Sequence, residues 1–407
     1  MKIVPSISKR YENISGGLTL ELQKGSAGHG PEYFVREGYD YMAWADMFFP
    51  DPTTPKSVID AMRKALDEDS VGHYNMEIGS DEIRELFATH FSKKFGRSVH
   101  PRRNILITSG TGPALTFTMM PFLSDDDEVL VPEPSYPNNY VNGKILGAKV
   151  VTVPLFREDN YQLKIEELEK VTTEKTKVLV LTNPNNPTGT VFRRECLEAV
   201  CEFVKRHNLV LISDEAFSDT VYDGIEFVHP CTLTDMWERT ITLYSISKGY
   251  GLSGLRIGCI IADDGIMDIY QATAVNVMGV PNTIATAGAI AALKDDSILK
   301  YNYERNERRR RIAYDILKDI PGTKLKMSES GITTWLDVRG LGTSIEVATR
   351  IKDDAKIIIS AGDPYGMHGV GFLRLVTSAY AKDEDAVMRL LKIKTVLFAI
   401  AKEKGLC

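Results

Sequence analysis

The segment 245–258 reads SISKGYGLSGLRIG and concentrates residues that could perform covalent and anion-binding chemistry. Lys248 follows a short apolar run that is typical of a strand, and the glycines after it permit tight backbone turns. A lysine amine in such a place suits a Schiff base with a carbonyl compound. Ser245, Ser247 and Arg256 add two hydroxyls and a guanidinium, which favour a phosphate group. The segment therefore predicts a covalent lysine beside an anion site.

The apolar pattern of the chain predicts the elements that must position this lysine. Seven short apolar runs are predicted strands: 104–108, 128–131, 149–153, 177–182, 209–213, 240–245 and 257–262. Helical patterns fall between several of them, at 138–146, 164–170 and 194–207. Short apolar strands separated by helices predict an α/β fold with a mainly parallel sheet covered on both faces. Ligands in such sheets bind beyond the carboxyl ends of the strands.

The later part of the chain has a different pattern, which predicts a second, smaller α+β domain. A long charged helix at 301–317 is followed by short strands at 333–338 and 356–360 and by a terminal helix at 383–402. We assign residues 50–295 to a large domain, and residues 1–49 and 296–407 to a small one. Four consecutive arginines, 308–311, follow Glu304 and Glu307 in the long helix, which indicates a solvated helix face.

Composition excludes several classes of protein. The 407 residues carry 49 basic and 55 acidic side chains, a formal charge of −6, which argues against a general nucleic-acid binder. The start of the chain lacks a secretory pattern and no apolar run is long enough to span a membrane, so we expect a cytoplasmic protein. The five cysteines have no paired spacing, so neither a disulfide framework nor a metal site is expected.

Eight short motifs are spread along the chain in a definite order. They are Tyr74 five residues before Gly79, Ser109-Gly110-Thr111-Gly112, Pro134-Ser135-Tyr136-Pro137, Asn183-Pro184-Asn185-Asn186-Pro187-Thr188-Gly189, Ser213-Asp214-Glu215, the Lys248 segment, Thr334-Trp335-Leu336-Asp337 and Phe372-Leu373-Arg374-Leu375. In type and order they resemble the class I/II aminotransferases, fold-type I enzymes that depend on pyridoxal 5′-phosphate (PLP). The resemblance covers nearly the whole chain and implies a large domain with a seven-stranded sheet.

The resemblance implies a set of cofactor contacts. Lys248 would hold PLP as an aldimine and move a proton at the substrate, while Asp214 would keep the pyridine nitrogen protonated, so that the ring withdraws electrons. The other implied contacts are Ser109, Gly110, Thr111, Ser245, Ser247 and Arg256 around the phosphate, Tyr136 stacked on the ring, Asn186 at the phenolic oxygen, Phe217 beside it, and Tyr74 of a second subunit.

The resemblance also implies how the substrate is bound. Arg374 would take the α-carboxylate of an L-amino acid in a bidentate pair, with Asn186 as a further contact. The implied reaction passes the amino group to the cofactor and then to a 2-oxo acid, in a homodimer with shared active sites. A PLP-binding gene regulator is disfavoured, because the residues before Pro55 are too few and not basic enough for a DNA-binding module.

The sequence departs from the family pattern at two positions. Phe217 stands where a tyrosine usually bonds the phenolic oxygen, so Tyr222 or Ser218 would have to compensate. Phe48 falls where a glycine usually meets the substrate. These departures keep open an alternative on the same scaffold, a lyase for C–S or β-elimination or an amino-acid oxidase or cyclase. Residues 264–299 contain no arginine for a second carboxylate, which argues against an acidic donor. The acidic residues Glu21, Glu32 and Asp46 of the N-terminal segment leave a basic donor open.

Overall fold

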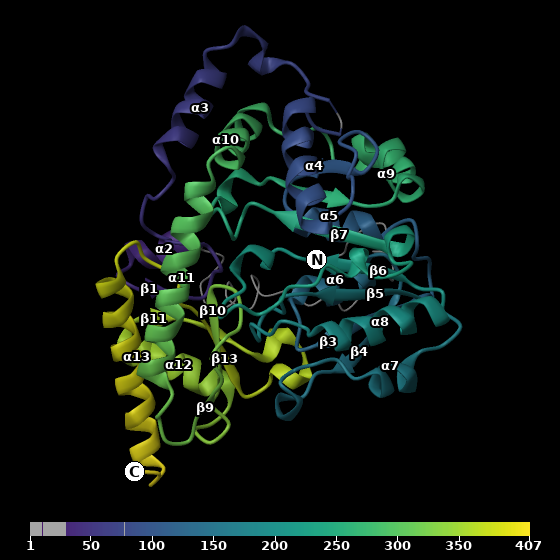
Figure 1. Ribbon diagram of the computed structural model, residues 1–407. Helices are drawn as coiled ribbons and strands as arrows, with labels where there is room; N and C mark the ends of the chain where they lie inside the picture. Colours follow the sequence, from purple (N-terminus) through teal and green to yellow (C-terminus); the bar gives the residue numbers. More distant parts are fainter. Residues whose placement is uncertain (1–9, 11–29, 77) are drawn as a thin grey trace, which may run out of the picture.

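The computed structural model describes residue 10 and residues 30–76 and 78–407 (Figure 1). Its centre is a seven-stranded sheet in the order β2-β8-β7-β6-β5-β3-β4. The strands are β2 (Ile105–Thr108), β3 (Glu128–Glu133), β4 (Lys149–Pro154), β5 (Thr176–Thr182), β6 (Val210–Asp214), β7 (Thr240–Ser245) and β8 (Gly258–Ile261). β8 runs antiparallel to both neighbours and the other pairs run parallel. The predicted mainly parallel, seven-stranded sheet is confirmed.

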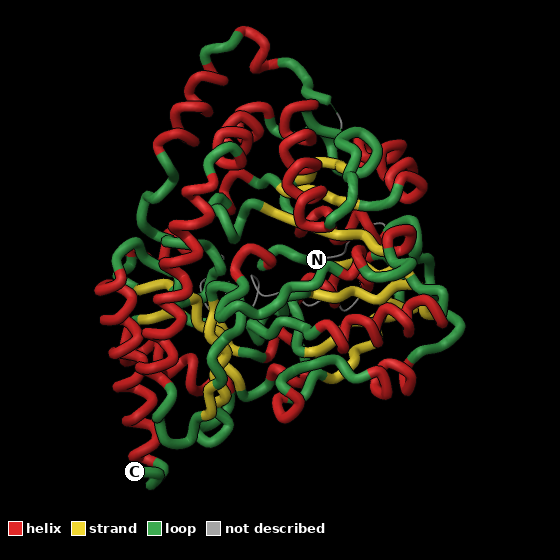
Figure 2. Tube along the Cα trace, viewed as in Figure 1, coloured by secondary structure: helices red, strands yellow, loops and turns green. Residues whose placement is uncertain are grey.

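Helices cover both faces of this sheet (Figure 2). They are α4 (Asp81–Phe95), α5 (Thr111–Met119), α6 (Pro137–Ile145), α7 (Ile165–Val171), α8 (Arg194–Arg206), α9 (Asp264–Val277) and α10 (Thr283–Leu293), and α3 (Lys56–Leu66) packs on α10. Strand β5 shows how the sequence achieves this, because successive strand residues point to opposite faces. Val178 and Val180 are buried in a core with α5 and α9, whereas Leu179 and Leu181 are buried with α7 and α8. Both faces are therefore apolar.

The C-terminal part forms a separate four-stranded sheet in the order β12-β13-β10-β9. Its elements are α11 (Asp296–Leu317), β9 (Lys324–Leu325), β10 (Thr333–Asp337), α12 (Ser344–Ala355), β11 (Ile357–Ile358), β12 (Ser360–Ala361), β13 (Phe372–Val376) and α13 (Asp383–Glu403). The predicted strand at 356–360 is divided, because Ile357 and Ile358 pair in parallel with β1 (Asp40–Tyr41), while Ser360 and Ala361 pair with β13.

The N-terminal part of the predicted small domain is described only from α2 (Pro31–Arg36) onward, apart from residue 10. Aromatic residues of α2 and β1 pack together, with Phe34 and Tyr41 buried against Ile358 of β11. This contact places the chain that leads to residues 42–49 beside the small sheet. The proposed domain boundaries themselves stay a prediction.

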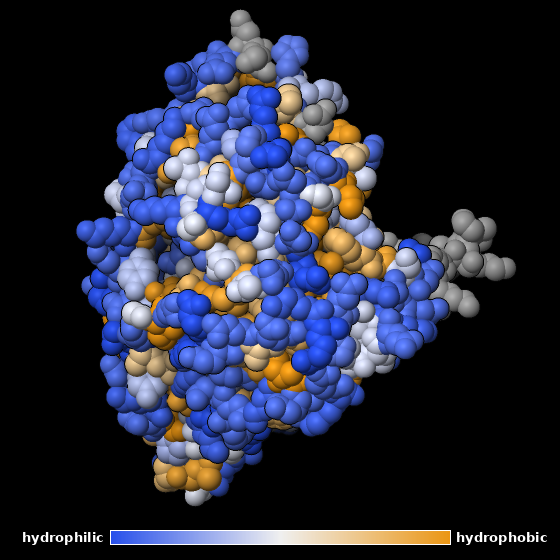
Figure 3. Space-filling model, turned by 45° about the vertical axis from the view of Figure 1, so that its right-hand side comes forward, coloured by the Kyte–Doolittle hydropathy of each residue, from blue (hydrophilic) through white to orange (hydrophobic). Residues whose placement is uncertain are grey.

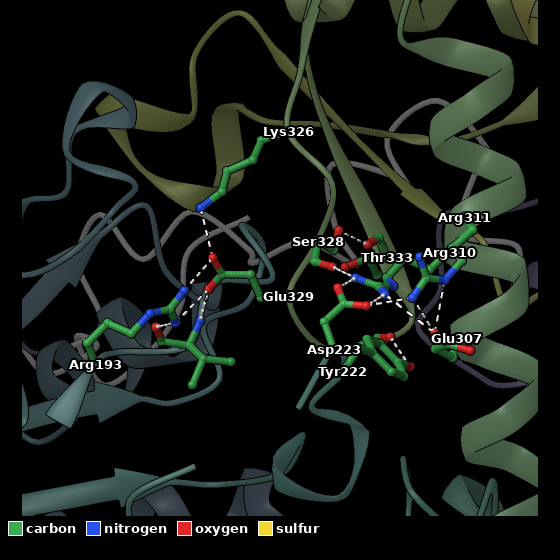
Figure 4. A network of polar contacts seen from close by, with 12 residues as sticks. Arg193, Tyr222, Asp223, Glu307, Arg310, Arg311, Lys326, Ser328, Glu329 and Thr333 are labelled. Atoms are coloured by element: carbon green, nitrogen blue, oxygen red, sulfur yellow. Dashed lines mark hydrogen bonds and ion pairs between the residues drawn. The ribbon is translucent and has the colours of Figure 1, made fainter. Parts of the chain in front are cut away.

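The interpretation of residues 308–311 as a solvated helix face is wrong for two of the four arginines. Arg309 and Arg310 are 1% and 4% exposed. Arg309 pairs with Asp383 at 2.8 Å. Arg310 donates to both carboxylate oxygens of Asp223 at 2.8 and 2.9 Å and to the Ser328 carbonyl at 2.7 Å (Figure 4). α11 lies between the small sheet and the loop after β6, so its arginines connect the two.

The outer surface is mostly hydrophilic on the face drawn in Figure 3, with apolar groups gathered in small areas. Among the helices of the described residues, none is both long and apolar enough to cross a membrane.

Candidate active site

Lys248 lies three residues after β7, where the chain leaves the carboxyl edge of the sheet. Its Nζ donates a hydrogen bond to the carbonyl oxygen of Ala45, and the centroid of the Phe217 ring lies 6.0 Å from Nζ. Burial lowers the pKa of Lys248 to about 8, and the nearby Asp46 carboxylate opposes that shift. An amine with such a pKa has an unprotonated fraction near neutral pH, as a nucleophile or proton carrier requires.

Asp214 is the last residue of β6, and its carboxylate is buried at the same edge of the sheet. One carboxylate oxygen accepts a hydrogen bond from the backbone N–H of Ala216 at 3.2 Å. Burial raises the pKa of Asp214 to about 6, because the ionised form loses its hydration. A protonated ring nitrogen against this carboxylate would supply a compensating positive charge. Asp214 therefore fits the pyridine nitrogen of PLP.

One side of an anion cradle is the turn between β2 and α5. Gly110 has a φ of +82°, and α5 begins at Thr111. Arg256 Nη2 donates to the Ser109 carbonyl at 3.0 Å, and a Cβ at Gly110 would lie 2.6 Å from the same nitrogen. Glycine thus lets the guanidinium lie against the turn. The unpaired N–H groups that begin a helix add further donors beside it.

The two serines complete the cradle from the neighbouring strand. Ser245 ends β7 in register with Gly258 of β8, and a Cβ at Gly258 would lie 3.1 Å from Cα of Gly110. The side chains of Ser245 and Ser247 are buried, with their hydroxyl oxygens 2.6 Å apart. Two hydroxyls, a guanidinium and a helix N-terminus form a donor set that suits a phosphate dianion. The phosphate of PLP fits these residues.

Arg374 lies in the middle of β13 and is 1% exposed. Its Nη1 donates to Asn186 Oδ1 at 3.2 Å, its Nη2 donates to the Ala43 carbonyl at 2.7 Å, and its Nε has no partner among the described residues. Its Cζ lies 5.1 Å from the centroid of the Tyr365 ring. A buried guanidinium held in this way can present a planar pair of N–H groups to a carboxylate.

The charges of Asp214, Arg374 and Arg256 act on both Tyr136 and Lys248. The pKa of Tyr136 is raised by burial and by Asp214, and is lowered by Arg374 and Arg256. The pKa of Lys248 responds to the same three charges. Tyr136 directly precedes α6, close enough to these charges for its pKa to respond to them.

The missing hydroxyl at position 217 is not replaced by Tyr222. The Phe217 ring is buried near Gly331, whereas the Tyr222 hydroxyl donates to the Gly331 carbonyl at 2.8 Å. Tyr222 is held there because the Arg310 guanidinium lies 4.6 Å from the centre of its ring. The Ser218 hydroxyl is buried without a hydrogen-bond partner among the described residues, so it stays a candidate.

Phe48 adopts the backbone conformation of a glycine. Its φ is +69°, in the left-handed region that a side chain strains. Its N–H donates to the Ser378 carbonyl at 2.9 Å, and its ring is buried with the Arg305 guanidinium 4.4 Å from the ring centre. The ring packs toward α11, and the strained backbone lies two residues after Asp46 and three after Ala45, whose carbonyl contacts Lys248. Phe48 therefore shapes the site through its backbone.

Tyr74 lies apart from the other predicted cofactor residues. Its side chain is 94% exposed, on the segment that follows α3. Within one chain the structure does not bring Tyr74 to the phosphate cradle.

Several groups at the site carried no signal in the sequence. The carbonyl oxygens of Ala43 and Ala45 accept from Arg374 and Lys248, but every residue has a carbonyl, so composition does not reveal them. Tyr365 precedes Arg374 in a glycine-rich loop and could have been suspected from that position.

Groups suited to a covalent carbonyl cofactor, its phosphate and a ring nitrogen lie together at the carboxyl edge of this sheet, and they define a PLP-dependent enzyme. Sequence comparison specifies the family. The model described as aminotransferase class I and II matches residues 42–390, so the chain belongs to that family. Members use PLP, and the protein is a PLP-dependent aminotransferase, which moves the α-amino group of an L-amino acid to a 2-oxo acid.

Similar proteins differ in the substrates that their names state. The chain is 32% identical to an aromatic-amino-acid aminotransferase of Thermococcus litoralis, over 84% of this chain and 89% of that protein. It is 29% identical to an LL-diaminopimelate aminotransferase of Dehalococcoides mccartyi, over 95% and 98% of the two chains. The aspartate aminotransferase of Thermus thermophilus with maleate has a TM-score of 0.85 at 25% identity, over 96% and 99% of the chains.

Proposed function

We propose that Lys248 is the covalent and proton-transferring lysine, that Asp214 faces the pyridine nitrogen, and that Arg374 takes the substrate's α-carboxylate. The observation that carries this proposal is the position of Lys248 and Asp214 at adjacent strand ends, with Arg374 bonded to Asn186. We assign the phosphate contacts to Ser109, Gly110, Thr111, Ser245, Ser247 and Arg256. We assign the ring contacts to Tyr136, Asn186 and Phe217.

When bound, PLP supplies an electron sink that stabilises negative charge at the substrate Cα. Asp214 maintains that property by holding a proton on the ring nitrogen. Arg374 fixes the substrate by its carboxylate, so that the Cα–H bond points in one direction. The Nζ of Lys248 removes the proton at Cα and returns it elsewhere on the reacting system, for which its lowered pKa is suited.

We also propose a donor whose side chain is uncharged or cationic. Asp46 lies beside Lys248 and accepts a hydrogen bond from the Ser253 hydroxyl. A second carboxylate on the substrate would meet this negative charge in a partly buried site, where like charges are poorly screened. The absence of arginine from residues 264–299 supports the same preference.

The proposed assembly is a homodimer with shared sites, in which Tyr74 reaches the phosphate of the other subunit. Its 94% exposure supports this, together with exposed Leu66 and Met76 on the same projecting segment (Figure 1). Exposed apolar residues close together in sequence favour an interface. A cytoplasmic location stays a prediction from the sequence.

The test exposes the holoenzyme to single L-amino acids without an acceptor and identifies the products by mass spectrometry. We expect one equivalent of 2-oxo acid per site and loss of the Lys248-bound cofactor absorbance. We further expect kcat/KM for aspartate to be at least about tenfold below that for phenylalanine or lysine, the size of a typical charge-repulsion effect.

Two variants serve as controls for this experiment. Lys248→Ala should abolish turnover while Lys170→Ala, at an exposed lysine on α7, should leave it unchanged. Catalytic release of ammonia would instead favour the elimination or oxidation alternative, to which Phe217 points. A preference for aspartate would contradict the donor proposal but leave the assigned lysine in place.

A further inference from the structure

The loop 362–371 crosses from the small sheet to the large one. It connects β12 to β13 and contains a short 3₁₀ turn, Met367–Gly369. Glu133, the last residue of β3, accepts two hydrogen bonds from His368 at the same oxygen: the backbone N–H at 2.9 Å and ring Nδ1 at 3.0 Å. A carboxylate can only accept, so Nδ1 carries the hydrogen. The Glu133 side chain is 4% exposed and that of His368 is 40% exposed.

The surrounding residues fit closely around this pair. A Cβ at Gly366 would lie 2.4 Å from Cγ and Cδ of Glu133, so the loop reaches the carboxylate only because glycine is present there. The His368 ring meets the edge of Phe156, with centroids 5.7 Å apart. The loop is therefore seated on the end of β3 by shape as well as by hydrogen bonds.

The same loop contacts the segment that holds Tyr136. The carbonyl oxygen of Tyr365 accepts a hydrogen bond from the Ser135 N–H at 3.1 Å and another from the Tyr140 hydroxyl at 2.8 Å. Glu133 directly precedes this 134–136 segment. Glu133 is therefore three residues from Tyr136, and His368 is three residues from Tyr365.

The loop also leads directly to the arginine of the site. The Tyr365 ring packs 5.1 Å from Cζ of Arg374, and the Gly362 N–H donates to the Phe372 carbonyl at 2.8 Å, which joins the loop to β13. A contact that holds this loop against β3 therefore also holds the Arg374 guanidinium in place relative to Tyr136.

We propose that Glu133 and His368 form an interdomain clasp that positions Arg374 for the substrate's α-carboxylate. Glu133 is a positioning residue, since it acts through the loop and Tyr365 and not on the reacting atoms. The inference rests on the proposed role of Arg374. It gives His368, a histidine of the glycine-rich loop before Arg374, a part in substrate affinity.

The test compares Glu133→Ala and His368→Ala holoenzymes with the wild type, because alanine at either position removes the side-chain group that makes the contact. A clasp that aligns Arg374 contributes equally to binding substrate and transition state, so its loss should raise KM for the amino acid about fivefold to tenfold and change kcat less than about twofold. Amide hydrogen exchange over 362–371, measured without substrate, should accelerate in both variants. His368→Asn keeps a side-chain N–H donor near the position of Nδ1 and should restore a KM close to that of the wild type.

His207→Ala is the matched control, because His207 Nε2 lies 2.9 Å from Glu169 in a similar pair at the surface of the large domain. It should change neither KM nor exchange in the loop. Unchanged exchange in both clasp variants, or faster exchange with an unchanged KM, would overturn the proposal. Arg374→Lys tests the role of Arg374 separately from the clasp. If KM does not rise in this variant, the proposed role of Arg374 is wrong. Hydrogen exchange in the loop 362–371 then tests whether Glu133 and His368 hold the loop.

Discussion

At the scale of single residues, burial produces the chemistry of the site. Asp214 and Lys248 are common residue types whose pKa values move toward neutrality because they lie at a covered sheet edge. The Asp214 carboxylate is ionised at neutral pH at the expense of folding stability, unless a cation approaches it. A buried carboxylate with a raised pKa is typical of a functional group that binds an oppositely charged ligand.

Asp214→Asn should therefore stabilise the cofactor-free protein while abolishing its activity with PLP. The folded-state pKa of about 6 lies above the unfolded value of 3.8. Above pH 6 the carboxylate is ionised in both states, and the shift lowers the free energy of unfolding by roughly 2–3 kcal/mol, which asparagine removes. Denaturant unfolding at pH 7 should show this gain, and most of it should disappear at pH 4, where the folded-state carboxyl is protonated.

Asp319→Asn, at an exposed aspartate, is the control and should change stability little at either pH. An equal gain for Asp214→Asn at pH 4 and pH 7 would show that the effect does not come from ionisation.

At the scale of elements, the cradle depends on how one turn meets one helix. Gly110 combines a left-handed φ with direct contact to Arg256, so two requirements coincide at a single position. The start of α5 and the ends of β7 and β8 are brought to this turn by sheet pairing. The donor set is therefore a property of three strand ends and one helix.

Gly110→Ala should weaken PLP binding about tenfold without preventing folding. The new methyl group would displace the mobile end of Arg256, and the backbone at φ +82° and ψ 178°, which essentially only glycine adopts, adds roughly 1–3 kcal/mol of strain. The dissociation constant is measured by titrating cofactor-free protein with PLP. Gly38→Ala is the control, because Gly38 has nearly the same φ, +81°, with nothing within 4 Å of the added Cβ. Equal effects of the two substitutions would attribute the loss to backbone strain alone.

At the scale of the whole molecule, the active site joins parts that are distant in the chain. Ala43 and Ala45 from the N-terminal segment, Asn186 and Lys248 from the large sheet, and Arg374 from the small sheet contact one another. Within α11, Arg310 binds Asp223 of the loop after β6, and Arg309 binds Asp383 at the start of α13. If Tyr74 acts across a dimer, a second chain completes this assembly.

Mixing two impaired variants tests the shared site. Lys248→Ala retains Tyr74, and Tyr74→Ala retains Lys248, so a hybrid dimer would contain one site with both residues. Subunit exchange should then restore activity up to about a quarter of the wild-type value, the share that random pairing gives when one site in two is intact. Activity that does not recover although two differently tagged variants co-purify as hybrid dimers would mean that each chain completes its own site.

The fold was largely predictable because its signals are local. Apolar runs such as 177–182 and 240–245 predict strands, and Lys248 and Asp214 follow strands closely enough to be placed at their carboxyl ends. Because parallel sheets are buried on both faces, their strands appear in the sequence as continuous runs of apolar residues, which are easy to recognise. The burial of Arg309 and Arg310 was missed because it depends on which faces α11 presents to two domains, and charge alone suggested solvent.

The sequence by itself determined the family, the sheet and the residue types that a PLP enzyme needs. Tertiary structure alone decided that Tyr222 is held at Gly331 and cannot replace the hydroxyl missing from Phe217. It also decided that Glu133 at the end of β3 meets His368 in the loop between β12 and β13. The physical reason is distance along the chain: local patterns fix elements through neighbouring residues, whereas contacts between residues more than a hundred positions apart depend on how whole elements pack.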